Sequence, residues 1–166
     1  MIEKARDYAI AAHGEQKYGD KPYIHHLEAV VKILEPHGDE AKLIGYLHDV
    51  AEDTHISIKE IEKEFGPFVA ACVAMLSDEP GANRKERKSK TYEKMSKVAG
   101  KEELALVVKA ADRLANIEAC ISDKNMSLLS MYQNEHEAFS KAVYRQGLCD
   151  DIWKRINKSI STYKYF

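Results

Sequence analysis

The stretch Leu47-His-Asp-Val-Ala-Glu-Asp-Thr54 places four ionisable side chains inside a segment whose apolar residues repeat with helical spacing. The apolar positions that define this spacing are Leu43, Ile44, Leu47 and Ala51. They predict a helix that packs into a hydrophobic core. Charged groups beside buried surface are costly, so this stretch requires a physical explanation.

His48, Asp49, Glu52 and Asp53 are the four ionisable residues of that stretch. Residues three and four apart are neighbours on a helix, so His48 would lie over Glu52. Asp49 would lie over both Glu52 and Asp53. A divalent metal ion would compensate the charge of a buried-facing imidazole beside three carboxylates. The alternative is a surface helix with a local ion cluster, and it is less favoured because more metal-type ligands recur along the chain.

Composition describes an ordinary soluble protein. At 166 residues the chain fits one domain with a sizeable core, and its formal net charge of -2 gives no reason to expect nucleic-acid binding. The N-terminus has charges but no apolar segment, so no secretory signal is expected. No apolar run approaches the roughly 18 residues that span a membrane. The cysteines are widely spaced without a CxxC pair, which predicts buried thiols in the cytoplasm. The oligomeric state stays open.

Helical spacing recurs along almost the whole chain, and no segment has a convincing strand alternation. The expected helix signals are a first helix ending near His13-Gly14, a second ending at Pro36-His-Gly38, a possible cap at Asp39, a capping box at Ser57-Ile-Lys-Glu60 and a helix start at Pro67. After a turn at 78–81, helices are expected over about 88–98, 102–119, 128–144 and 150–160. We expect one compact all-α domain over residues 1–166, with a motif-bearing core at about 5–120 and C-terminal helices in 121–166.

Metal-type ligands come from separated segments of the chain: His26, His48, Asp49 and Asp112. Two imidazoles and two carboxylates suit a divalent ion such as Mn²⁺, Fe²⁺ or Zn²⁺. Asp112 stands in an apolar helical segment, where a charge needs a partner. The alternative for Asp112 is a carboxylate paired with Lys109 or Arg113 on a solvated face.

Several motifs in this order resemble the HD-domain metal-dependent phosphohydrolases, and more narrowly the hydrolase half of RelA/SpoT proteins and the small alarmone hydrolases of the metazoan SpoT-homologue type. The motifs are Ala11-Ala-His13, Pro22-Tyr-Ile-His-His26, Leu47-His-Asp-Val-Ala-Glu-Asp-Thr54, Phe65-Gly66, Glu86-Arg-Lys88 and Val108-Lys-Ala-Ala-Asp-Arg-Leu-Ala-Asn116. A bare His-Asp pair is weak evidence, but these motifs in combination are specific. The resemblance implies an all-α HD-domain bundle.

The resemblance also implies roles for individual residues. It implies that one metal, usually Mn²⁺, is bound by His26, His48, Asp49 and Asp112. Glu52 and Asp53 match the pair that orients and activates the attacking water. A second metal held by His25 or His55, as in dinuclear HD phosphodiesterases, is the less favoured alternative.

For the substrate, Asn116 matches a residue that lines the nucleoside pocket, and Tyr132 loosely matches a later pocket tyrosine, with a core or surface aromatic as its alternative. Family members often have an Arg-Lys pair before Pro-Tyr, whereas this chain has Lys17-Tyr18. A tyrosine can stack on a base and a lysine can contact a phosphate. Residue 118 is Glu where the synthetase–hydrolase proteins commonly have Arg.

The run Asn83-Arg-Lys-Glu-Arg-Lys-Ser-Lys90 holds five cations and one anion. Such runs are usually solvated faces, but its place between the metal motifs favours attraction of a polyanionic substrate. Nucleic acid is a poor alternative, because the run is short and lacks interleaved aromatics. The cations expected to neutralise a departing pyrophosphate are Lys17, Lys109, Arg84, Arg87 and Lys88.

These features predict a cytoplasmic, Mn²⁺-dependent hydrolase that converts (p)ppGpp to GDP or GTP and pyrophosphate. The substrate would be a small nucleotide, and no nucleic-acid or membrane partner is expected. The chain is too short to hold a synthetase domain as well. Two alternatives stay open. One is another HD phosphohydrolase, acting on a deoxynucleotide or on the 2′-phosphate of NADPH. The other is a non-catalytic metal or nucleotide sensor.

Overall fold

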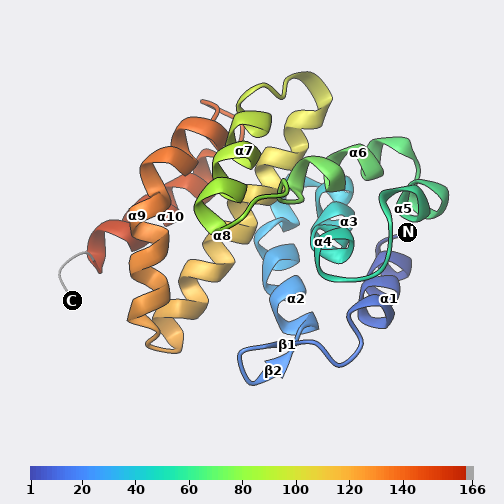
Figure 1. Ribbon diagram of the computed structural model, residues 1–166, viewed down its shortest axis with the longest axis horizontal. Helices are drawn as coiled ribbons and strands as arrows, with labels where there is room; N and C mark the ends of the chain where they lie inside the picture. The colour runs from blue at the N-terminus through green and yellow to red at the C-terminus, as the bar shows by residue number, and fades with distance from the viewer. Residues whose placement is uncertain (164–166) are drawn as a thin grey trace.

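The computed structural model describes residues 1–163, and almost all of them are helical or lie in short connections (Figure 1). The α-helices are α1 (Ile2–His13), α2 (Ile24–Ile33), α3 (Asp39–Leu47), α4 (Val50–Asp53), α5 (Ile58–Phe65), α6 (Pro67–Leu76), α7 (Arg84–Ser96), α8 (Leu104–Ser122), α9 (Met126–Val143) and α10 (Asp150–Thr162). Two 3-10 turns, η1 (Glu35–His37) and η2 (Gly100–Glu103), connect neighbouring helices. The predicted all-α class is confirmed.

Helix α8 is the central element of the fold. It contacts α2, α3 and α6 on one side and α9 and α10 on the other, and Figure 1 shows it between these two groups of helices. One hydrophobic cluster, reaching from Ala5 to Ile156, includes residues from both groups. Because α8 is surrounded, its polar residues Lys109, Asp112 and Arg113 are buried. The fold therefore places charged side chains of α8 in the interior.

Local signals explain several helix ends. Ser57 and Glu60 form the predicted capping box, with Glu60 N–H donating to Ser57 Oγ at 3.3 Å and Ser57 N–H donating to Glu60 Oε2 at 2.8 Å. Pro67 lies in the first turn of α6, as expected. The expected cap at Asp39 is wrong, because Asp39 is already inside α3 and Gly38 precedes the helix. The Asp39 carboxylate instead accepts from Lys42 at 2.7 Å.

The helix that contains the cations of the basic run 83–90 begins earlier than expected. Helix α7 begins at Arg84 rather than near residue 88, because Asn83 Oδ1 accepts from the backbone N–H of Glu86 at 2.9 Å. This side-chain cap satisfies one of the free donors at the helix start. The cations of the run therefore occupy the first turns of a helix, and their helical spacing decides which of them share a face.

A short hairpin was not expected from the sequence. β1 (Lys17–Tyr18) and β2 (Lys21–Pro22) pair antiparallel, with Tyr18 opposite Lys21. Gly19, with φ of 62°, supplies the positive φ of a tight two-residue turn. Strands this short leave no alternation pattern in the sequence. The hairpin leads directly into α2 and so positions the residues that precede His26.

Among the described residues, no helix combines the length and the apolar character that crossing a membrane requires.

Candidate active site

His48 and Asp49 lie in a turn, and the prediction that they belong to one continuous helix is wrong. Helix α3 ends at Leu47 and α4 begins at Val50. Consecutive residues of a regular α-helix point about 100° apart, whereas here His48 Nε2 and Asp49 Oδ2 approach to 2.9 Å. The interruption therefore allows two adjacent side chains to face the same point.

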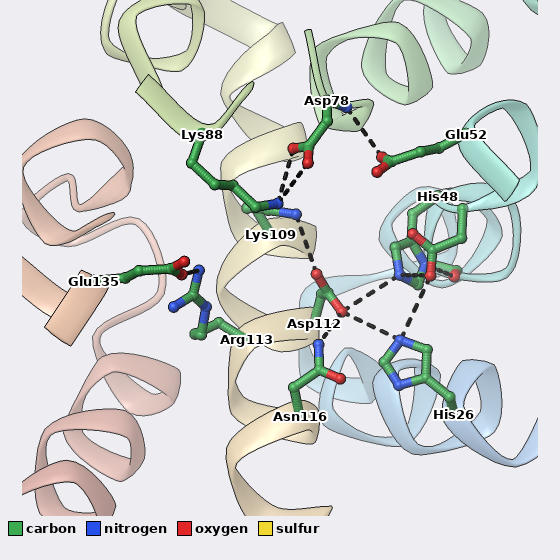
Figure 2. Close-up of polar contacts among 12 residues, drawn as sticks. His26, His48, Glu52, Asp78, Lys88, Lys109, Asp112, Arg113, Asn116 and Glu135 are labelled. Carbon is green, nitrogen blue, oxygen red and sulfur yellow. Dashed lines mark hydrogen bonds and ion pairs between the residues drawn. The ribbon is translucent and has the colours of Figure 1, made fainter. Parts of the chain in front are cut away.

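The four predicted metal ligands converge, although they come from three separate segments. Figure 2 shows His26, His48 and Asp112 facing one another. His26 Nε2 of α2 lies 3.2 Å from Asp112 Oδ1 of α8 and 3.6 Å from Asp49 Oδ2. His48 Nε2 lies 3.5 Å from the same Asp112 oxygen. His26, His48 and Asp49 each offer a ligand atom within 4.8 Å of the others. The alternative for Asp112 holds in one part, since Asp112 does pair with Lys109 at 3.2 Å. Its other part is wrong, because Asp112 is only 8% exposed and does not lie on a solvated face.

The chemistry of this cluster fits a divalent cation. The ring of His48 donates from Nδ1 to the backbone oxygen of Gly45 at 2.7 Å, which leaves Nε2 facing two carboxylates. That buried Nε2 atom has no hydrogen-bond partner within residues 1–163. Burial lowers the pKa of His48, but Asp49 and Asp112 outweigh it and raise this pKa well above its usual value. The pocket between these side chains thus attracts positive charge, and imidazole and carboxylate are suitable ligands for a divalent metal.

Polar neighbours orient the two carboxylates. Tyr23 donates its hydroxyl to Asp49 Oδ2 at 2.6 Å, and Asn116 Nδ2 donates to Asp112 Oδ1 at 2.8 Å. Lys109 Nζ donates to Asp112 Oδ2 at 3.2 Å (Figure 2). Burial lowers the pKa of Lys109, but Asp112 and Asp49 raise it more strongly, so Lys109 is a cation. Such supporting contacts fix the geometry of ligating groups.

Glu52 and Asp53 lie on α4 and line the same cavity as the cluster. Glu52 Oε2 accepts from the backbone N–H of Asp78 at 3.0 Å, and Asp53 Oδ2 accepts from Gln16 Nε2 at 3.0 Å. Burial raises the pKa of Glu52, although the Asp78 N–H lowers it in part. A carboxylate with a raised pKa is a stronger base than an ordinary glutamate.

The cavity has a volume of about 190 Å³ and is almost entirely polar. It is lined by Tyr18, Tyr23, His26, Asp49, Glu52, Asp53, Arg84, Lys88, Lys109, Asp112, Arg113, Asn116 and Tyr132. His48 is not part of this lining: it is 1% exposed, and its Nε2 faces Asp49 and Asp112, which do line the cavity. Two predicted substrate contacts, Lys17 and Arg87, lie outside this lining. The structure therefore brings most of the predicted site residues into one cavity.

One wall of the cavity is cationic, and acids hold its side chains in place. Arg84 and Lys88, four residues apart on α7, both line the cavity. Lys88 Nζ pairs with Asp78 at 2.8 Å, and Arg84 Nε donates to Glu135 Oε1 at 2.7 Å. Glu135 also pairs with Arg113 of α8 at 3.1 Å. Asp78 and Glu135 were not among the predicted site residues, because an isolated acid in a turn or on a long helix carries no motif signal.

The remaining two predicted cations lie elsewhere. The stem of Arg87 packs against the turn at Gly81, where even an added methyl group would come within 3.1 Å of Arg87 Cγ. The hairpin residue Lys17 is exposed. The prediction that these two side chains bind substrate in the cavity therefore gains no support from their positions.

Tyr18 and Tyr132 are among the residues that line the cavity. The ring of Tyr18 stacks on that of His26, with centroids 4.6 Å apart, and its hydroxyl donates to Asn116 Oδ1 at 2.6 Å. Tyr132, for which a core or surface role was the alternative, lines the cavity from α9. The guanidinium of Arg113 lies 4.6 Å from the Tyr132 ring centroid. Burial raises the pKa of Tyr132 to about 12, so its hydroxyl stays protonated.

Comparison with known proteins adds independent observations. Residues 5–147 match the HD domain. The chain is 37% identical over 123 residues to a probable guanosine-3′,5′-bis(diphosphate) 3′-pyrophosphohydrolase of Synechocystis, which covers 70% of this chain and 16% of the relative. It is 35% identical over 117 residues to the guanosine-3′,5′-bis(diphosphate) 3′-pyrophosphohydrolase MESH1 of Drosophila melanogaster, covering 66% of this chain and 64% of the relative.

The matched region thus spans 16% of the length of the Synechocystis relative and 64% of the length of the Drosophila relative. Among solved structures, a metazoan orthologue of SpoT described as hydrolysing ppGpp aligns with a TM-score of 0.84. The alignment covers 99% of this chain and 96% of that chain at 23% sequence identity. This likeness shows that the two proteins share their fold.

Proposed function

Because the chain belongs to the HD-domain family, we propose that it is a metal-dependent phosphohydrolase that removes the 3′-pyrophosphate of (p)ppGpp. The observation that carries this proposal is that one cavity brings together a candidate metal site, two carboxylates that can take up a proton and two cations that can bind phosphate. A candidate metal cluster, the carboxylates of Glu52 and Asp53, and the cations Arg84 and Lys88 all face the same space. The names of the Synechocystis and Drosophila relatives support the choice of substrate.

The metal would be held by His26, His48, Asp49 and Asp112, and when bound it supplies Lewis-acid activation of the phosphoryl group. We propose Mn²⁺, because a mixture of imidazole and carboxylate ligands suits a borderline-to-hard ion.

Two carboxylates of the protein would serve as the base for the attacking water. Glu52 and Asp53 would accept the proton from this water, whose oxygen bonds to the phosphorus attached to the 3′ oxygen. The bond between that phosphorus and the 3′ oxygen then breaks, and the 3′ oxygen takes up a proton. The products are pyrophosphate and GDP or GTP. Positioned acid–base groups of this kind typically contribute on the order of 10²–10⁴ in rate.

Cations in fixed positions would hold the 3′-diphosphate. Arg84 and Lys88 are held by Glu135 and Asp78, so they enter the reaction already oriented. Preorganised charge stabilises a developing anion without the cost of rearrangement. Lys109 would contribute its charge from beside Asp112. From outside the lining, Lys17 and Arg87 would act only through long-range attraction.

The nucleoside would be bound by Tyr18, Asn116 and Tyr132, which line the cavity. We propose that the base stacks against an aromatic ring of this group. We further propose that the protein acts in the cytoplasm on this small-molecule substrate, with neither nucleic acid nor membrane as a partner.

A second candidate is an HD phosphohydrolase with a different nucleotide substrate, such as a deoxynucleotide or NADPH. Two observations favour it. The Tyr18 hydroxyl donates to Asn116 Oδ1, so this acceptor is already used, and Glu118 pairs with Arg155 at 2.6 Å. Tyr18 and Glu118 both differ from the residues that alarmone hydrolases commonly have at these positions. A non-catalytic sensor is less favoured, because a binding protein has no use for Glu52 and Asp53.

A nucleotide panel tests the proposal. The Mn²⁺-loaded and the chelator-treated protein would each be incubated with ppGpp, GMP, dGMP and NADPH. We expect ppGpp to be cleaved fastest and chelation to abolish the reaction. Asp112→Ala should be inactive. The matched control is Asp151→Ala, which changes an exposed aspartate of α10 that pairs with His37 of η1, and this variant should be active. Cleavage of NADPH or dGMP with ppGpp left intact would favour the second candidate. Binding without any turnover would favour the sensor.

A further inference from the structure

A chain of contacts outside the cavity lining leads to Asp53. The Nδ1 atom of His13, at the end of α1, lies 2.9 Å from Gln16 Oε1. Gln16 Nε2 in turn lies 3.0 Å from Asp53 Oδ2. Neither His13 nor Gln16 lines the cavity. The Gln16 amide therefore connects a buried imidazole to a carboxylate of the candidate site.

The hydrogen-bonding capacity of each group decides which atom donates and which accepts between His13, Gln16 and Asp53. An ionised carboxylate only accepts hydrogen bonds, so the Gln16 NH₂ group must face Asp53. The carbonyl oxygen of Gln16 then faces His13, and Nδ1 of that ring must carry the hydrogen that it donates. Within the described part of the chain, the other ring nitrogen of His13 has no hydrogen-bond partner. The Gln16 contact is thus the polar contact that orients the His13 ring.

The backbone holds Gln16 in place from both sides. Its N–H donates to the carbonyl oxygen of His13 at 2.9 Å, and its carbonyl oxygen accepts from the N–H of Tyr23 at 3.1 Å. The rings of His13 and Tyr23 stack with centroids 4.3 Å apart. The Tyr23 hydroxyl contacts Asp49. The connected residues His13, Gln16 and Tyr23 thus reach the carboxylates of Asp53, at the end of α4, and of Asp49, directly before it.

We propose that Gln16 is a positioning residue for Asp53. Its side-chain amide would donate to one carboxylate oxygen and hold the other toward the reacting water. This inference rests on the proposed function, because it assigns Asp53 a part in the chemistry. A misplacement of about 1 Å at a reacting centre can cost on the order of 10²-fold in rate.

Two substitutions at Gln16 separate donation from packing. Gln16→Ala removes the amide, and kcat should fall by up to about 10²-fold with KM and bound metal unchanged. Gln16→Glu keeps the size and can still accept from His13, but an ionised glutamate cannot donate to Asp53. It should therefore lose at least as much kcat as Gln16→Ala. A Gln16→Glu variant with wild-type kcat would overturn the proposal.

Gln133→Ala is the matched control. Its side chain donates to the carbonyl oxygen of Ile160 at 3.2 Å and joins α9 to α10. The control should keep kcat, even if it lowers stability. A similar loss of kcat in Gln133→Ala and Gln16→Ala would show that the effect follows general stability and would overturn the positioning role.

A double-mutant cycle tests whether Gln16 acts through Asp53. In an Asp53→Asn background, Gln16→Ala should change kcat by less than about 2-fold, because residues that act as a unit are not additive. A further loss as large as in the wild-type background would overturn the proposal. The cycle is measured on whichever nucleotide the panel shows to be cleaved, so a wrong substrate assignment does not affect it.

A readout independent of activity completes the test. The side-chain NH₂ signal of Gln16 in an ¹⁵N-edited NMR spectrum, identified by its loss in Gln16→Ala, should shift in Asp53→Asn and in His13→Ala. An unmoved signal in both variants would overturn the contact itself, whether or not the protein hydrolyses ppGpp.

Discussion

Asp112 links the imidazoles of the candidate metal cluster to polar residues of its own helix α8. Its two oxygens face His26, His48, Lys109 and Asn116. Burial alone would raise the pKa of Asp112, but Lys109 and the two imidazoles lower it well below its usual value. The carboxylate is therefore ionised and available to a cation. Its removal would leave the buried ammonium of Lys109 without its partner.

We predict that Asp112→Ala and His48→Ala each lower the metal content and the stability. The metal loses a ligand in both variants, and breaking a buried ion pair typically costs about 3–5 kcal/mol. Elemental analysis and thermal unfolding would measure the two effects, with Asp151→Ala as the control. One equivalent of metal retained in both variants would contradict the ligand assignment.

Glu52 and Asp53 are predicted to act on the reaction rather than on metal binding. Glu52→Gln and Asp53→Asn keep the size of each side chain but cannot accept the proton. We expect normal metal content and KM, with kcat lowered on the order of 10²–10⁴-fold. Steady-state kinetics beside elemental analysis would test this. A variant with near-normal kcat would identify its residue as structural.

The pH dependence of kcat/KM follows from two shifted groups. Burial raises the pKa of Glu52, so its basic form is lost at a higher pH than in an ordinary glutamate and sets the acid limb. Burial and the Lys109 cation lower the pKa of Lys88, so its charge is lost below the usual lysine range and sets the alkaline limb. A bell-shaped profile is expected.

Lys88→Arg should move the alkaline limb to higher pH, because arginine stays protonated. Profiles at constant ionic strength would measure the shift. An alkaline limb at the same pH in Lys88→Arg would assign it to another group.

At the scale of elements, α7 presents only some of its cations to the cavity. Arg84 and Lys88 line the cavity, whereas Arg87 does not. We predict that Arg84→Ala and Lys88→Ala raise KM for ppGpp and weaken its dependence on salt, since charge contacts are screened over roughly 10 Å at 0.1 M ionic strength. Arg87→Ala, on the same helix, is the matched control and should have a much smaller effect. Equal effects at all three positions would indicate diffuse electrostatic attraction instead of direct contacts between the substrate and the cations that line the cavity.

The elements themselves were predictable where a local signal exists. The capping box at Ser57 and the proline at position 67 mark helix ends in the sequence, and both are confirmed. The turn at His48-Asp49 and the hairpin at Lys17 were not predicted. Apolar spacing continues through the first, and the second is too short to show alternation. Propensity and spacing describe local structure, whereas these two features depend on tertiary contacts.

At the scale of the whole molecule, the site is assembled from segments far apart in the sequence. The motifs identified the residues that converge on the cavity, and their roles stay predictions. Asp78 and Glu135 could not be found in this way, because their importance lies in contacts with Lys88, Arg84 and Arg113. The contact between Arg84 and Glu135 joins residues 51 positions apart. Only the folded arrangement around α8 shows which acids orient which cations.

The central claim concerns which bond of the substrate is broken, and the products of hydrolysis in H₂¹⁸O test it most directly. The Mn²⁺-loaded protein would be incubated with ppGpp, and the products would be resolved by ³¹P NMR and mass spectrometry. The account predicts GDP and pyrophosphate in equal amounts, with one ¹⁸O atom in pyrophosphate and none in GDP. Release of inorganic phosphate, or ¹⁸O in the nucleotide product, would contradict it.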